Sequence, residues 1–175
     1  MSKCVEINKT KLNGVHLIKP SFIFEDFRGF IVELYNKEEY IKNGINVEFL
    51  QDNISTSSKN VLRGIHGDTH NYKLVSCLSG KIYTVVVNCD ESSKEFGKWD
   101  SFTLSHYNKS QIFIPPNFGL AHLVLSDEAI FHYKLSTGIK PDSIKQFTYR
   151  YDDPRFNIWW PVKNPILSKR DELSN

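Results

Sequence analysis

The chain has 175 residues, of which 40% are hydrophobic and 13% aromatic, enough apolar material to fill the core of one domain. Its 22 lysines and arginines against 20 aspartates and glutamates give a net charge of +2 without a basic block, which excludes an obvious nucleic-acid-binding surface. No apolar run approaches the roughly 20 residues that a helix needs to cross a bilayer, and the polar N-terminus is unlike a signal peptide. We therefore expect a single soluble domain over residues 1–175, with no membrane and no nucleic-acid partner.

In chain order, the predicted elements are mostly short strands in which apolar and polar residues alternate. The period-2 pattern predicts strands at residues 31–34, 73–78, 82–88, 101–104, 111–114, 122–125, 130–135 and 146–151. Turn-forming residues separate them at 78–81, 89–94, 105–110, 115–119 and 126–128. Such a series predicts an all-β sandwich or barrel.

One segment, residues 36–44, has helical character. Asn36 can cap its N-terminus, Glu39 follows three residues later, and Gly44 can end it. The segment after Pro154 keeps large apolar residues, so we expect it to pack on the domain and to bring Asp171 near structured residues. The expected fold is all-β with one or few short helices.

The cysteines indicate a reduced compartment. Cys4, Cys77 and Cys89 are odd in number and show no C-x-x-C spacing, and two of them lie in runs that are typical of buried strands. We therefore expect a cytoplasmic protein.

Residues 60–80 have the spacing of a metal site without its ligands. From His66 onward they fit the metal-binding cupin motif G-(x)5-H-x-H-(x)3-4-E-(x)6-G, but Lys73 occupies the glutamate position. An ammonium repels a divalent cation and offers no lone pair. The alternative trio of His66, Asp68 and His70 would share one face of an ideal strand, but residues 67–71 are typical of a turn. We expect no metal and no cofactor.

A second cupin motif, P-x-G-x-x-H, has a counterpart that is one residue longer at residues 116–122. The two motifs together predict a cupin fold, which is a double-stranded β-helix jelly roll.

Several motifs in order resemble the dTDP-4-dehydrorhamnose 3,5-epimerase family of cupin-fold sugar-nucleotide epimerases. They are D-F-R-G-F-I-V-E (26–33), Q-D-N-I-S-T-S-S-K-N-V-L-R-G-I-H (51–66), K-L-V-S-C-L-S-G (73–80), F-G-K-W (96–99), I-P-P-N-F-G (114–119), L-V-L-S-D (123–127), F-H-Y-K (131–134), D-D-P (152–154) and P-I-L-S-K-R-D (165–171). The resemblance implies a metal-free epimerase of a 4-keto nucleotide sugar. Such a reaction needs a base, a partner for the enolate oxygen, and an acid on the opposite face of the sugar.

The resemblance also implies the catalytic residues. His66 matches the family's base, and Asp171 matches the carboxylate that orients it and stabilises its imidazolium. Lys73 matches the lysine near the enolate oxygen, in the place where metal-binding cupins have a ligand. Tyr133 matches the acid that returns a proton from the other face.

Six residues are expected to bind substrate. Arg28 and Arg63 resemble the family's diphosphate contacts, since a planar guanidinium suits phosphate oxygens. The expected sugar and nucleotide contacts are Glu33, Gln51 and Asn53. The sixth candidate is His122, which lies two positions after Leu120, where the family has its histidine; strand parity can place both on one side.

The nucleotide and the oligomeric state are further expectations. The family commonly has tyrosines near the nucleotide base where this chain has Gly138 and Ile139, and several of its motifs resemble the branch that acts on GDP-linked heptoses. We therefore favour a GDP-linked 4-keto-6-deoxy-heptose of capsule or surface polysaccharide synthesis over a dTDP sugar. The family resemblance also implies a homodimer in which N-terminal strands join the partner's sheet.

Three alternatives stay open. The enzyme can invert C3 alone or both C3 and C5. A 3,4-ketoisomerase of related fold would move the ketone instead, although such enzymes usually carry a G-H-A-H-K-like run that is absent from this sequence. A binding cupin or a metal-dependent cupin would need a bound metal.

Overall fold

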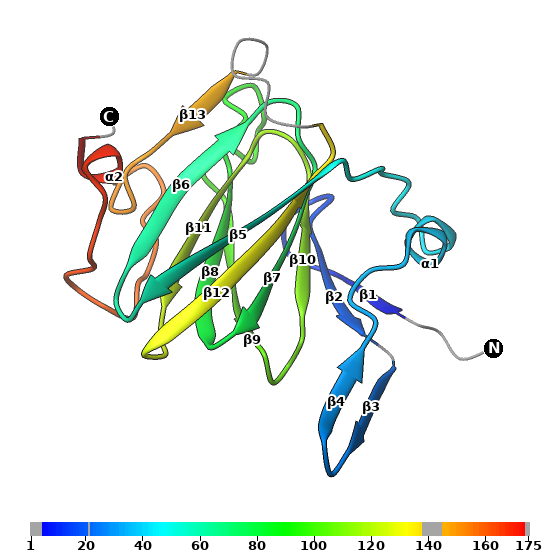
Figure 1. Cartoon of the computed structure of the whole chain (residues 1–175). Helices are drawn as coiled ribbons and strands as arrows, with labels where there is room; N and C mark the ends of the chain where they lie inside the picture. The colour runs from blue at the N-terminus through cyan, green and yellow to red at the C-terminus, as the bar shows by residue number, and fades with distance from the viewer. Residues whose placement is uncertain (1–4, 21, 138–144, 174–175) are drawn as a thin grey trace.

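The computed structural model describes residues 5–20, 22–137 and 145–173. Two antiparallel sheets face each other, and a two-stranded hairpin extends away from them (Figure 1). The six-stranded sheet contains, in spatial order, β1 (Val5–Lys9), β2 (His16–Pro20), β10 (Gln111–Ile114), β7 (Lys73–Ser79), β12 (Glu128–Leu135) and β5 (Gln51–Ser58). The five-stranded sheet contains β13 (Gln146–Thr148), β6 (Leu62–Asp68), β11 (Phe118–Val124), β8 (Lys81–Asn88) and β9 (Trp99–Ser105).

The remaining elements are the hairpin and two short helices. The hairpin consists of β3 (Ile23–Asp26) and β4 (Gly29–Val32), and the helices are α1 (Lys37–Lys42) and α2 (Lys169–Leu173). Among the described residues no helix is long and apolar enough to span a bilayer. The predicted all-β jelly roll with few short helices is confirmed.

The main core lies between the two sheets. The six-stranded sheet contributes buried side chains such as Val75 and Phe131, and the five-stranded sheet contributes Val86 and Leu104. Many of the strands that pair in space are distant in sequence, as where β7 lies between β10 and β12. Residues from separate parts of the chain can therefore line one cavity.

Helix α1 forms where local sequence signals predict it. The side chain of Asn36 accepts a hydrogen bond from the backbone N–H of Glu39 at 3.3 Å, and Gly44 takes a φ of +93° just after the helix. A glycine tolerates that left-handed conformation at little cost, so it ends the helix as expected.

Most predicted strands are present, but with changes at both ends of the chain. The strand predicted at 31–34 ends at Val32 in β4, and the one predicted at 146–151 is shortened to β13. Strands β1, β2, β3, β5 and β6 were not predicted. The turn predicted at 67–71 starts later, because Gly67 and Asp68 still belong to β6.

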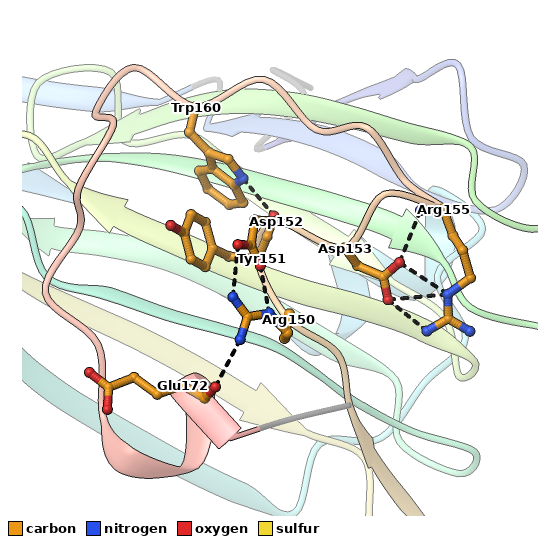
Figure 2. Close-up of polar contacts among 7 residues, drawn as sticks. All are labelled: Arg150, Tyr151, Asp152, Asp153, Arg155, Trp160 and Glu172. Carbon is orange, nitrogen blue, oxygen red and sulfur yellow. Dashed lines mark hydrogen bonds and ion pairs between the residues drawn. The ribbon is translucent and has the colours of Figure 1, made fainter.

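The segment after Pro154 packs on the outer face of the five-stranded sheet, as expected. Trp160 lies in an apolar cluster with Leu62 and Val85, and its indole N–H donates to the carbonyl of Tyr151 at 2.8 Å (Figure 2). Arg150 forms a two-point ion pair with Asp152 and also donates to the backbone carbonyl of Glu172 in α2 at 3.0 Å. These contacts hold the C-terminal helix against the sheet.

Candidate active site

A pocket of about 410 Å³ is lined by residues from both sheets and from α2. It brings together six of the residues predicted for the site: Arg63, His66, Lys73, His122, Tyr133 and Asp171. His66 comes from the five-stranded sheet, whereas Lys73 and Tyr133 come from the six-stranded sheet. The pocket therefore has ionisable groups on two opposite walls.

His66 and Asp171 form a close pair across 105 positions of sequence, with 2.5 Å between Nε2 and Oδ1. Burial lowers the pKa of His66, and the charge of Asp171 partly offsets that effect. The imidazole is therefore neutral near pH 7, and the bond to Asp171 assigns the N–H to Nε2. Nδ1 keeps its lone pair and can act as a base.

A capping arrangement at the start of helix α2 orients Asp171 toward His66. The backbone N–H of Asp171 donates to Ser168 Oγ at 3.2 Å, and that hydroxyl donates to Asp171 Oδ2 at 2.9 Å. Asp171 is only 2% exposed, and both of its carboxylate oxygens have partners. Sequence reasoning missed Ser168, although S-x-x-D is a helix-capping pattern that signals it.

Lys73 is held beside a carboxylate that sequence reasoning assigned to a turn. Its Nζ lies 2.9 Å from Asp68 Oδ2, and each residue is 7% exposed. Burial raises the pKa of Asp68, but the charge of Lys73 and the N–H donors of Asn71 and His70 outweigh it and hold the pKa below its ordinary value. The pair is thus a carboxylate with an ammonium at the pocket wall.

His122 lies inside the pocket wall as a neutral imidazole. Burial lowers its pKa to about 3, with smaller contributions from the charges of Arg63 and His66. Its ring stacks on Phe131 with 4.1 Å between the centroids, and its Nε2 is buried without a partner among the described residues. A buried nitrogen without a partner favours a hydrogen bond to a bound molecule.

Tyr133 reaches the pocket because residues alternate along β12. Phe131 and Tyr133 face inward, whereas His132 and Lys134 point to the other face of the sheet, where they contact Asp52. Burial raises the pKa of Tyr133, so the phenol keeps its proton at neutral pH.

Two further predicted residues lie next to the pocket, and a third lines it. Gln51 and Asn53 lie outside the lining of the pocket but pair across strands with Leu135 and Tyr133, so they lie beside it. Arg63 is inside, and its Nε donates to Ser57 Oγ at 2.9 Å.

Arg28 and Glu33 are not brought to this pocket. Arg28 lies in the turn of the β3–β4 hairpin, where it pairs with Asp26 at 2.6 Å, and Glu33 follows that hairpin and accepts from Asn36. The hairpin extends away from the two sheets (Figure 1). Within one chain, these two residues cannot act together with His66.

The donor set does not suit a metal. Within residues 5–20, 22–137 and 145–173, no three His, Cys, Asp or Glu side chains are arranged to hold an ion. His70 is exposed and its ring contacts Thr69, so it does not join His66 and Asp68 in a site.

Comparisons with known proteins identify the family of the chain. The profile of the family described as dTDP-4-dehydrorhamnose 3,5-epimerase matches residues 9–175. Enzymes of that name from Shigella flexneri and Escherichia coli K12 are each 40% identical to the chain, over 95% and 96% of it and 93% and 92% of their own lengths.

Solved structures of similar fold include relatives with bound ligands. The 3,5-epimerase of Legionella pneumophila in complex with dTDP-4-keto-L-rhamnose has a TM-score of 0.90 at 36% identity, covering 97% of this chain and 91% of that one. ChmJ, a 3'-monoepimerase from Streptomyces bikiniensis in complex with dTDP-quinovose, has a TM-score of 0.87 at 28% identity, covering 94% and 84%.

These relatives are described for dTDP-linked sugars, so the comparisons do not support the GDP-linked heptose that was expected from the sequence. The fold, the family profile and the 40% identity along nearly the whole chain lead to one conclusion. The chain belongs to the dTDP-4-dehydrorhamnose 3,5-epimerase family and is a sugar-nucleotide epimerase.

Proposed function

We propose that the enzyme inverts C3 and then C5 of a nucleoside-diphosphate 4-keto-6-deoxy sugar, with His66 as base and Tyr133 as acid. The observation that supports this most is their placement on opposite sheets around one pocket, with Lys73 beside them. A base and an acid on opposite walls can act on opposite faces of a sugar ring, which is the requirement for inversion.

The proposed inversion at C3 consists of one proton removal and one proton return. His66 Nδ1 takes the proton from C3, and the C–H electron pair moves into the C4 ketone to form an enolate. The ammonium of Lys73 stabilises the negative oxygen. Tyr133 then protonates C3 from the other face as the ketone re-forms. The imidazolium and the tyrosinate afterwards exchange protons with water.

We propose a dTDP-linked sugar as the first substrate to test, since the named relatives are enzymes of dTDP sugars. The GDP-linked heptose stays as a second candidate because the motifs at residues 63–68 and 122–134 resemble the branch that acts on GDP-linked heptoses. Leu120, which replaces the family's histidine in the pocket, bears instead on whether C3 alone is inverted. The other signal for GDP falls on Gly138 and Ile139, which lie outside the described residues. The capsule role and the cytoplasmic location remain predictions from the sequence.

Deuterium wash-in tests this proposal. The protein is incubated in deuterium oxide with the dTDP-linked and the GDP-linked 4-keto-6-deoxy sugars, and the products are analysed by NMR. Label at C3 and C5 is the expected result, whereas label at C3 alone indicates a monoepimerase. A product with its ketone at C3 would indicate the ketoisomerase, and no label with either nucleotide would contradict the proposal.

We also propose a homodimer, supported by the apolar surface of the hairpin. Phe24, Phe27, Phe30 and Ile31 are 50%, 97%, 50% and 68% exposed. So many exposed apolar side chains on one small element are typical of an interface. In such a dimer Arg28 would serve the partner's pocket.

A further inference from the structure

The contact between Asp68 and Lys73 joins the two walls of the pocket. Asp68 ends β6 in the five-stranded sheet, two residues after His66, and Lys73 begins β7 in the six-stranded sheet. We infer that Asp68 is a positioning residue, which pairs with Lys73 Nζ and fixes it relative to His66. The inference rests on the proposed function, in which Lys73 faces the enolate oxygen.

The carboxylate of Asp68 is itself held rigidly. Its Oδ1 accepts the backbone N–H groups of His70 and Asn71, at 2.9 and 2.6 Å, and the side-chain amide of Asn71 at 3.2 Å. The carbonyl of that amide accepts from the backbone and hydroxyl of Thr137, each at 2.9 Å. Three donors on Oδ1 leave Oδ2 for Lys73.

The Lys73 ammonium has N–H groups for which no described residue other than Asp68 is an acceptor. Its Nζ lies 2.9 Å from Asp68 Oδ2. The remaining N–H donors are therefore available to an oxygen atom in the pocket. A buried donor without a partner is costly, and a substrate oxygen would remove that cost.

No other carboxylate at the pocket can replace Asp68. Among the described lining residues, the other carboxylate is Asp171, which is bound to His66. Burial keeps His122 and Tyr133 uncharged at neutral pH, and burial raises the pKa of the nearby Cys89 thiol to about 12. The remaining charged lining residues, Arg63 and Arg170, are cations. Without Asp68 the ammonium would be buried among neutral and positive groups and would release its proton more readily.

The chain offers a matched control in Asp153. It is also 7% exposed, its Oδ1 accepts the backbone N–H two residues ahead at 2.9 Å, and it pairs with the cation Arg155 at 2.6 Å. Figure 2 shows this pair, which is not part of the pocket lining. Asparagine at either position can still accept from the turn N–H, so each substitution removes charge and keeps the turn.

The experiment compares Asp68→Asn with Asp153→Asn in the full-length protein. For D68N we expect kcat to fall about 10-fold to 100-fold, with KM changed less than about twofold. This magnitude is taken from metal sites, where loss of a residue that orients a ligand has an effect of that size. The alkaline limb of the kcat profile should move to lower pH. D153N should keep the wild-type kcat and profile. Asp68→Ser is the second variant if D68N does not fold.

A second measurement does not depend on activity. Lys73 is labelled with acetic anhydride over a pH series and quantified by mass spectrometry; the amine of D68N should react at lower pH than that of the wild type and of D153N. Unchanged labelling, or a loss of kcat without a shift of the alkaline limb, would overturn the inference. Failure of the wild type to incorporate deuterium would instead count against the proposed function.

Discussion

At the scale of single residues, the pocket contains two pairs of directly contacting ionisable side chains and two further side chains that are uncharged. His66 is paired with Asp171 and Lys73 with Asp68, whereas His122 and Tyr133 stay neutral at physiological pH. The same cause, burial, lowers the pKa of the histidines and raises the pKa of the tyrosine. Burial thereby keeps the two histidines and the tyrosine uncharged, as their proposed roles need.

Replacement of Asp171 should weaken the base and change its titration. In Asp171→Asn we expect kcat to fall by about 10² to 10⁴, because the imidazolium loses its counter-charge. The carboxylate raises the pKa of His66, so its loss lowers that pKa. The acid limb of kcat/KM should lie below about 6.5 in the wild type and at lower pH still in the variant. A limb that moves to higher pH would contradict this assignment.

Replacement of His122 should affect binding without a pH signature. Phenylalanine can keep the stack on Phe131 but removes the ring nitrogens, so His122→Phe should lower kcat/KM by up to about tenfold, the value of one hydrogen bond. The acid limb should not move, because a pKa of about 3 leaves His122 neutral throughout the assay range. Unchanged kinetics would remove His122 from the site.

At the scale of elements, the site depends on a C-terminal helix that is too short to be stable alone. Helix α2 has five residues and is tied to the segment around β13 by Arg150, through the carbonyl of Glu172, and by Arg170, which donates to Thr148 at 2.6 Å. Thr148 in turn pairs with His66 across β13 and β6. The helix is therefore connected to the strand of the base.

Arg150 and Arg155 provide a matched comparison at this scale. Both form ion pairs with a nearby aspartate, but Arg150 also contacts α2 (Figure 2). In Arg150→Gln we expect faster amide hydrogen exchange in residues 169–173, because α2 loses the donor that binds the Glu172 carbonyl. Arg155→Gln should leave this exchange unchanged. Equal exchange in both variants would show that the contact does not hold the helix.

The strands differ in how far the sequence reveals them. Both β7 and β12 were predicted. Strand β12 alternates because one face packs in the core, whereas β7 is buried on both faces, with Val75 in the main core and Leu74 in a second apolar cluster. Strand β5 has the sequence QDNISTSS, with polar residues toward the pocket side and solvent on the other, so it shows no alternation. It is an edge strand stabilised by pairing with β12, which a local pattern cannot indicate.

At the scale of the whole molecule, the jelly roll assembles the site and leaves one element without a partner. The pocket takes residues from β5, β6, β7, β11, β12, β13 and α2, whereas the hairpin with Arg28 lies apart (Figure 1). In the proposed dimer, the hairpin would pack on the partner subunit, and Arg28 would contact the substrate in the partner's pocket.

Subunit complementation tests the dimer. Arg28→Ala and His66→Asn should each be weakly active alone. Equal mixtures, unfolded and refolded together, should recover about a quarter of wild-type activity, because half of the dimers are hybrids with one intact pocket. A monomer by sedimentation, or no recovery although each variant alone refolds to a dimer, would contradict the proposed arrangement.

The sequence by itself determined the fold class, helix α1 and the residue types of the chemistry, because alternation, capping and turn signals act over a few neighbouring residues. It also indicated that a lysine replaces a metal ligand. Only the tertiary structure decided that Asp68 contacts Lys73, that Ser168 supports Asp171, and that Arg28 lies away from the pocket. Such contacts depend on how distant strands pair across two sheets, and local sequence patterns carry no record of that pairing.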